Sequence, residues 1–219
     1  MATFTATAGS STTIGYAQYG STSWNTGTTD GACQGAYQGT ASSNSRVGVL
    51  VFSGAGAALQ GKVIQSMTLK ITCSAAGSGK TNKVLSFRKA LYQSLKTGIK
   101  GSAQVGDLLG TLTGKFYDNT VTHTLSPSSN ASLFNAVKDY FTAGNSVLVI
   151  YNGETSSSSG YSSNYARVTT VVLTVTSIEA TVWYRNGSTW QQCTVWYCNA
   201  GTWVQCVPYY NSGGSWIRV

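Results

Sequence analysis

The chain has 219 residues, of which 42% are hydrophobic and only 9% charged, and its net charge is +8. The hydrophobic content excludes intrinsic disorder, and no stretch approaches the 18 apolar residues that a membrane-spanning helix needs. Abundant Gly, Ser, Thr, Val and Tyr favour an extended β protein with polar, uncharged faces.

The amino-terminal region predicts strands and lacks an export signal. Residues 2–8 (ATFTATA) and 14–19 are predicted strands, and a long loop of small residues follows through position 45. The opening MATFTATAGSSTT has neither the basic region nor the apolar run of a signal peptide. We therefore expect synthesis in a cytoplasm without export by the general secretory route.

The middle of the chain predicts further strands. Residues 46–52 (RVGVLVF) are almost continuously apolar, as in the core of a sandwich. Residues 63–73 alternate, with a shift near Ser66 that fits a bulge, and they place four residues near one face: Ile64, Met67, Leu69 and Ile71. The loop 74–83 contains AAGSGKT, but Ser74 stands where a phosphate-binding loop requires glycine, so we predict a hairpin turn. Strands are also predicted over 84–91, 105–112 and 115–125.

One helix is predicted, in SPSSNASLFNAVKDYFTAG. A Ser or Asn within 129–132 can cap it, and Gly144 ends it. Its apolar face consists of Leu133, Val137, Tyr140 and Phe141. A strand at 146–151, an exposed loop at 152–165 and a strand at 168–175 complete the region. Residues 1–178 thus predict an antiparallel jelly-roll or β-sandwich, with the helix at one end or crossing between the sheets.

Residues 179–219 form a second unit, built from three 13-residue repeats. The copies read TVWYRNGSTWQQC, TVWYCNAGTWVQC and VPYYNSGGSWIRV, and they align without gaps. Asn186-Gly187 fits a tight turn that needs positive φ at both central residues. The repeats therefore predict a small antiparallel hairpin array with aromatic ladders. An array of this size rarely folds without a partner surface, which the preceding domain, another subunit or a larger particle would supply.

The aromatic residues of the repeats have two interpretations. Their rings could cover one another in place of a core, or they could stack on sugar faces beside hydrogen-bonding Asn, Gln, Ser and Thr. The candidate ligand surface comprises Trp183, Tyr184, Trp190, Trp196, Tyr197, Trp203, Tyr209, Tyr210 and Trp216. A secondary candidate is the loop with Tyr151, Tyr161, Tyr165 and Arg167, whose residues could instead pack over a sandwich edge.

Reactive groups are sparse, so we expect no enzyme, no cofactor and no metal site. The chain has six acidic residues and one histidine, His123, which lies in an alternating segment. The five cysteines are an odd number and lack paired CxxC units; Cys193 and Cys206 share a repeat phase with Val219, and Cys193 could pair with Cys198. The basic residues are dispersed and accompany no nucleic-acid motif; they would suit an acidic surface such as cell-wall polymer.

Two parts of the chain resemble known protein families. Residues 12–177 resemble DNRLRE-type domains in the order of their segments, which are RVGVLVF, VIQSMTLKITC, the helix, SVLVIYNGE and SSNYARVTTVVLTVT. These are jelly-roll sandwiches similar to carbohydrate-binding modules of cell-surface and phage proteins. The acidic-arginine signature that names the family is missing, so no functional residue is transferred. Residues 181–219 resemble the VWYYN-G-W repeats at the C-termini of tail and fibre proteins in phages of gut Firmicutes.

These observations together predict a bacteriophage virion protein displayed on the particle, which binds host-surface glycans. Its partners would be other virion proteins and copies of itself, with a trimer as one symmetric arrangement. We expect neither nucleic-acid binding nor membrane insertion. One alternative is a capsid decoration or head-fibre protein whose repeat is an assembly contact, and another is a bacterial carbohydrate-binding module.

Overall fold

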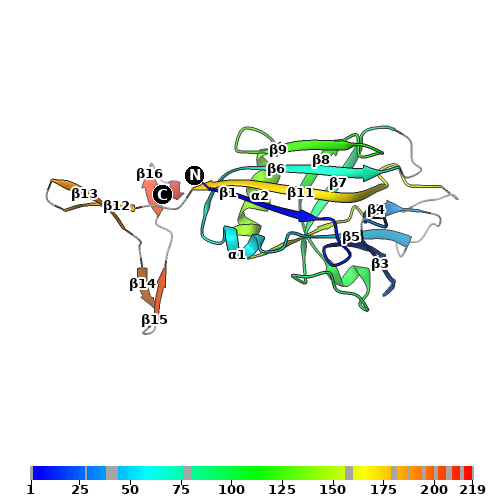
Figure 1. Cartoon of the computed structure of the whole chain (residues 1–219), viewed down its shortest axis with the longest axis horizontal. Coiled ribbons are helices and arrows are strands. Elements are labelled where there is room, and N and C mark those ends of the chain that lie inside the picture. The colour runs from blue at the N-terminus through cyan, green and yellow to red at the C-terminus, as the bar shows by residue number, and fades with distance from the viewer. Residues whose placement is uncertain are drawn as a thin grey trace.

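A computed structural model describes residues 2–27, 29–37, 44–75, 80–155, 160–178, 182–186, 188–193, 196–199, 202–205, 209–212 and 215–218. From residue 182 onward the description concerns the backbone, apart from the exposed Ser188 and Cys198. The chain forms an antiparallel β-sandwich followed by hairpins (Figure 1), as the sequence predicts.

The sandwich is one curled sheet whose described strands all pair antiparallel. Its strands are β1 (Ala2–Ala8), β2 (Ile14–Gln18), β3 (Trp24–Thr26), β4 (Ala32–Ala36), β5 (Ser45–Val51), β6 (Val63–Ser74), β7 (Lys83–Ala90), β8 (Val105–Gly114), β9 (Thr120–Leu125), β10 (Val147–Ile150) and β11 (Ala166–Ile178). The order is β8-β7-β10-β5-β4-β11-β6-β9, with β1 on β11 and β2 on β5, and β3 on β2. Strand β4 joins the two layers, because it pairs with β5 on one side and β11 on the other.

The main core lies between the two layers. The apolar residues predicted for β6 are all buried there, at 5% exposure or less: Ile64, Met67, Leu69 and Ile71. The register between β6 and β11 shifts at Gln65, next to the predicted bulge. A smaller cluster of valines on the outer face of β5 and β10 includes Val49 and Val149, which are directly paired.

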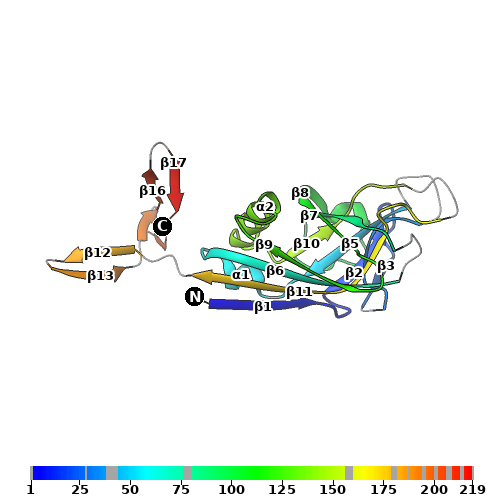
Figure 2. The same cartoon turned by 90° about the horizontal axis from the view of Figure 1, so that it is seen from above.

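Helix α2 (Ala131–Thr142) covers the open side of the curled sheet. The edge strands β8 and β9 end the strand path, and α2 contacts both (Figure 2). Its buried face has the predicted residues and also Phe134. Gly144, at φ +93°, follows the last turn and donates its N–H to the Phe141 carbonyl, so it ends the helix as predicted. The cap position is Asn130, but its side chain donates to the Thr124 carbonyl and not to the helix backbone.

Four short elements were not predicted from the sequence. The expected loop before residue 45 contains strands β3 and β4, and β4 (ACQGA) has no alternation because all its residues are buried. A second α-helix, α1 (Ala55–Leu59), and a 3-10 helix, η2 (Gly101–Gln104), lie in connections. Helix α1 comes so close to the turn after α2 that a Cβ on Gly56 would lie 2.0 Å from the Gly144 carbonyl oxygen.

Two expectations for loops and one for a strand were wrong. The segment 74–83 is not a hairpin turn, because β6 and β7 belong to different layers and do not pair; residues 76–79 lie outside the described part. The strand expected over 115–125 begins only at Thr120, after a turn with Asp118 at φ 46°. The loop 152–165 is not uniformly exposed, since Ser162 and Tyr165 are buried. Among the described helices none is long and apolar enough to span a membrane.

Candidate functional site

Each 13-residue repeat forms one β-hairpin. The pairs are β12 (Val182–Asn186) with β13 (Thr189–Cys193), β14 (Trp196–Asn199) with β15 (Thr202–Gln205), and β16 (Tyr209–Ser212) with β17 (Ser215–Arg218). The register is the same in all three, because Arg185, Cys198 and Asn211 each lie opposite the tryptophan of the following strand. The hairpin prediction is therefore confirmed for every copy.

The described hairpin strands pair only within their own repeat. Three two-stranded sheets result, rather than one sheet that continues from copy to copy. The predicted aromatic ladders therefore do not arise from strand pairing between repeats among the described residues.

Alternation along the strands divides the nine candidate aromatic positions between two faces. Trp183 pairs with Gln192, and Trp190 with Arg185, which places both tryptophans on one face of the first hairpin. Tyr184 pairs with Gln191 on the other face. The same division places Trp196, Trp203, Tyr209 and Trp216 on the first face, and Tyr197 and Tyr210 on the second. We call these the tryptophan face and the tyrosine face.

The turn in the first repeat differs by one residue from the prediction. Asn186 pairs with Thr189 and so belongs to strand β12 rather than to the turn, in which Ser188 lies. Gly187 itself lies outside the described residues. Cys198 is an exposed free thiol, so the suggested bond between Cys193 and Cys198 is not formed.

Three of the four residues in the secondary candidate site meet at the far end of the sandwich. Tyr161 and Tyr165 have ring centroids 4.5 Å apart, and Arg167 follows on β11. Tyr151 does not join them.

Tyr151 belongs to a different cluster, on the outer face of the opposite layer. It stacks on Tyr19 at 5.2 Å, and the Arg88 guanidinium lies 5.6 Å from its ring centroid. Arg88 also donates to the carbonyls of Tyr151 and Gly106, so its charge and its donors hold the end of β10 in place.

Residues from distant parts of the chain complete the site around Tyr161 and Tyr165. Tyr37 stacks on Tyr161 at 4.3 Å, the Cys33 Sγ lies 3.7 Å from the Tyr165 hydroxyl, and the Arg46 guanidinium lies 5.3 Å from the Tyr16 ring centroid. We call this group the tyrosine–arginine cluster: Tyr16, Cys33, Tyr37, Arg46, Tyr161, Tyr165 and Arg167.

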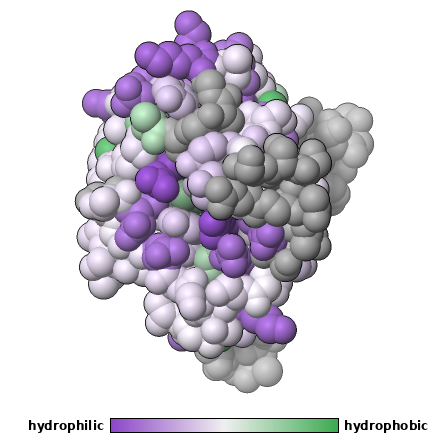
Figure 3. All heavy atoms as spheres, turned by 90° about the vertical axis from the view of Figure 1, so that its right-hand side faces the viewer, coloured by the Kyte–Doolittle hydropathy of each residue, from purple (hydrophilic) through white to green (hydrophobic). Residues whose placement is uncertain are grey.

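The cluster lies where the β4 end meets the loop before β11. Tyr37 and Tyr161 form an isolated antiparallel bridge, and the Ala36 N–H donates to the Ser162 hydroxyl at 2.9 Å. This end of the sandwich faces the viewer in Figure 3, where hydrophilic residues gather on the described surface. It is opposite the end of β11 that leads to the hairpins (Figure 1).

A hydrogen-bonded loop positions the cluster. The Glu154 carboxylate accepts from the Asn164 backbone and side chain, at 3.0 and 2.6 Å, and from the Ser163 hydroxyl at 3.0 Å. Burial alone would raise the pKa of Glu154, but these donors outweigh burial and hold the pKa below its ordinary value. Gln34, fully buried on β4, donates to the Asn164 carbonyl at 3.1 Å and thereby connects this loop to the sheet.

The Tyr16 and Tyr165 hydroxyls and the Cys33 thiol are neutral at physiological pH. Burial raises the pKa of Cys33 and of Tyr165 above their ordinary values, and burial likewise raises the pKa of Tyr16. None of these three groups therefore supplies a negative charge to the neighbouring guanidinium groups.

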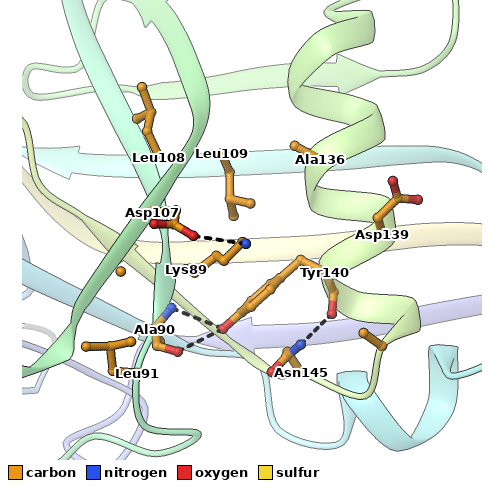
Figure 4. Close-up of a pocket in the computed structure, with 12 residues that line it drawn as sticks. Lys89, Ala90, Leu91, Asp107, Leu108, Leu109, Ala136, Asp139, Tyr140 and Asn145 are labelled. Carbon is orange, nitrogen blue, oxygen red and sulfur yellow. Dashed lines mark hydrogen bonds and ion pairs between the residues drawn. The ribbon is translucent and has the colours of Figure 1, made fainter.

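A groove lies between β7, β8 and α2 (Figure 4). Its volume is 680 Å³, and its lining includes Leu91, Leu108 and Leu109. Its polar groups satisfy one another, since Lys89 pairs with Asp107 at 3.2 Å and the Tyr140 hydroxyl bonds to both backbone groups of Ala90. The groove therefore offers few free polar groups to a ligand.

Sequence reasoning missed Tyr16, Tyr37 and Arg46. Tyr16 and Tyr37 lie in the Gly- and Ser-rich region before residue 45. Strand pairing places Tyr16 opposite Gly48 of β5 and Tyr37 opposite Tyr161. One signal was available: Arg46 and Arg167 both stand near the start of strongly apolar strands in a chain with few charges.

Within the described residues, no group of three or more His, Cys, Asp or Glu is arranged to hold a metal ion. Comparison of the chain with models of protein families and with curated proteins found no match.

Proposed function

We propose that this protein is a bacteriophage virion protein, displayed on the particle, that binds host-surface glycans through the tryptophan face of its hairpins. The observation that carries this proposal is the common register of the three hairpins, which repeats an aromatic pair on one face. Aromatic ring faces suit the apolar faces of sugars. By register, the positions on that face also include Gln192, Gln205 and Arg218, whose residue types can form hydrogen bonds.

Repetition adds to this argument. A single aromatic pair would bind a sugar weakly, whereas linked copies raise the effective concentration of the second and third contacts. Residues 181–219 also resemble repeats of phage tail and fibre proteins, which supports a virion location.

A second candidate function is an assembly contact within the particle. Isolated two-stranded hairpins are marginally stable in water, and the described hairpin strands pair with nothing outside their own repeat. A virion partner or symmetry-related copies, as in a trimer, would supply the missing cover.

The register provides a matched pair of variants that tests the adhesion proposal. Trp190→Ala/Trp203→Ala/Trp216→Ala alters the tryptophan face, and Tyr184→Ala/Tyr197→Ala/Tyr210→Ala alters the opposite face of the same hairpins. Binding to host cell walls and to a glycan array is measured for both variants, the intact protein and a form without residues 181–219.

Loss of binding in the tryptophan variant and the truncated form, with binding retained in the tyrosine variant, supports adhesion through the tryptophan face. Absence of binding by the intact protein contradicts it. Release of the truncated protein from particles, again without glycan binding by either form, favours the assembly contact.

A further inference from the structure

The two arginines of the tyrosine–arginine cluster, Arg46 and Arg167, lie on the two strands that pair with β4. Strand β4 is paired on both sides, with Gly35 opposite Arg46 of β5 and Cys33 opposite Arg167 of β11. Gly35, at φ +82°, interrupts the regular alternation of β4, so packing rather than alternation relates the two side chains. The Arg46 guanidinium lies 5.3 Å from the Tyr16 ring centroid, and Tyr16 packs with Cys33, the residue opposite Arg167.

The two guanidinium groups act on the same small region. Both charges influence the Tyr16 hydroxyl and the Cys33 thiol. The Nε atom of Arg46 and the Nε atom of Arg167 are both buried, and neither has a hydrogen-bond partner. A buried donor without an acceptor costs free energy, and a charged one costs more.

The chain supplies no ion-pair partner for either group within the described residues. Asp30 is close enough to influence Tyr16 but forms no ion pair with either arginine, and Glu154 is occupied by Asn164 and Ser163. The neighbouring segments 38–43 and 156–159 contain no acidic residue in the sequence. The remaining acidic residues are in other regions: Asp107 and Asp139 at the groove, Asp118 before β9, and Glu179 after β11.

We propose that Arg46 and Arg167 form an anion site, which binds a carboxylate or phosphate group of a ligand at the end of the sandwich opposite the hairpins. An anion there would accept from the two unpaired Nε–H groups and compensate the positive charges of the two guanidinium groups. The tyrosine rings cover one another and form a wall of the site, since Tyr161 lies between Tyr37 and Tyr165. This proposal does not depend on glycan binding by the hairpins, because the two sites are at opposite ends of β11.

The first test measures the thermal stability of the full chain in sodium phosphate, sodium glucuronate and sodium chloride at equal ionic strength. An anion that binds only the folded state raises its melting temperature. The site variant is Arg46→Gln/Arg167→Gln, and the charge-matched control is Lys70→Gln/Lys96→Gln, which removes two exposed lysines.

We expect phosphate, glucuronate or both to stabilise the wild type and the control beyond chloride, and to lose this effect in the site variant. Binding constants from calorimetry should fall about tenfold or more in the site variant, as for the loss of charge-assisted hydrogen bonds. The more effective anion identifies the group that the site takes, and glucose as a neutral probe should have no effect.

A second measurement uses only the wild-type protein, so it does not depend on the folding of a variant. In wild-type protein, the Nε–Hε NMR signals of Arg46 and Arg167 should shift with the same anion, while that of Arg88, which bonds to two backbone carbonyls, stays in place. The proposal is overturned if neither anion moves these signals, or if the site variant responds as the control does.

Discussion

Strands β11 and β13 show how differently the two parts of this chain are held. Strand β11 pairs with β6 along one edge, with β4 and β1 along the other, and it buries Val171, Leu173 and Val175 in the core. Strand β13 contains the strand-forming residues Thr189 and Trp190, yet it pairs only with β12. The sandwich derives its stability from contacts between residues far apart in sequence, whereas each hairpin depends on residues within one repeat.

This difference has a functional counterpart. The tyrosine–arginine cluster needs four strands and two loops to assemble, so the sandwich presents one site. The hairpins present the same two faces three times, because every copy contains the whole unit.

The largest expected effect comes from a cavity in the sandwich core. Leu173→Ala removes a fully buried side chain and should lower the free energy of unfolding by ~2–5 kcal/mol. Lys70→Ala, on the neighbouring strand and exposed, should change it by less than ~0.5 kcal/mol. Denaturant unfolding should be followed by circular dichroism, because five of the six tryptophans are in the repeats. Equal losses in the two variants would contradict a core centred on β11.

The next effect is a loss of sandwich stability in alkali. Burial raises the pKa of Cys73 from 9.0 to about 12, and burial raises that of Cys33 as well. A thiol whose pKa is higher in the folded state than in the unfolded state stabilises the fold fully at pH values below its unfolded-state pKa. This stabilisation is lost as the pH rises toward the folded-state pKa. The melting temperature should therefore fall between pH 9 and about 12.

The control for this pH dependence is Cys33→Ala/Cys73→Ala. Its melting temperature should vary less with pH over the same window, although Tyr165 and Tyr16 retain part of the effect. A profile identical to that of the wild type would show that the buried thiols do not contribute.

The smallest effect should follow removal of the hairpins. Deletion of residues 181–219 should shift the melting temperature of the sandwich by less than about 2 °C, because the described hairpin strands pair only with one another. Calorimetry on the intact and truncated proteins measures the shift. A decrease of more than about 5 °C would mean that the hairpins stabilise the sandwich, and the contrast between the two regions would have to be abandoned.

Local patterns were sufficient for much of the fold. The alternation in β6, the apolar face of α2 and its end at Gly144 are consequences of neighbouring residues, and all three are confirmed. The prediction for β4 failed because ACQGA has no alternation: the strand is buried on every side where the two layers join. The hairpin expected at 74–83 failed because the choice between pairing with the next strand and crossing to the other layer depends on the whole sheet.

The two candidate sites differ in the same way, because one depends on local sequence and the other on pairing across the whole sheet. The sequence by itself determined the three hairpins and their 13-residue phase, because each turn and both of its strands are within one copy. Only the tertiary structure decided that Arg167 and Arg46 lie on the two strands that pair with β4, that Tyr161 stacks on Tyr37, and that Tyr151 belongs to another cluster. Side-chain periodicity specifies which face of a strand is buried, but partners more than a hundred residues away are chosen by the pairing of the entire sheet.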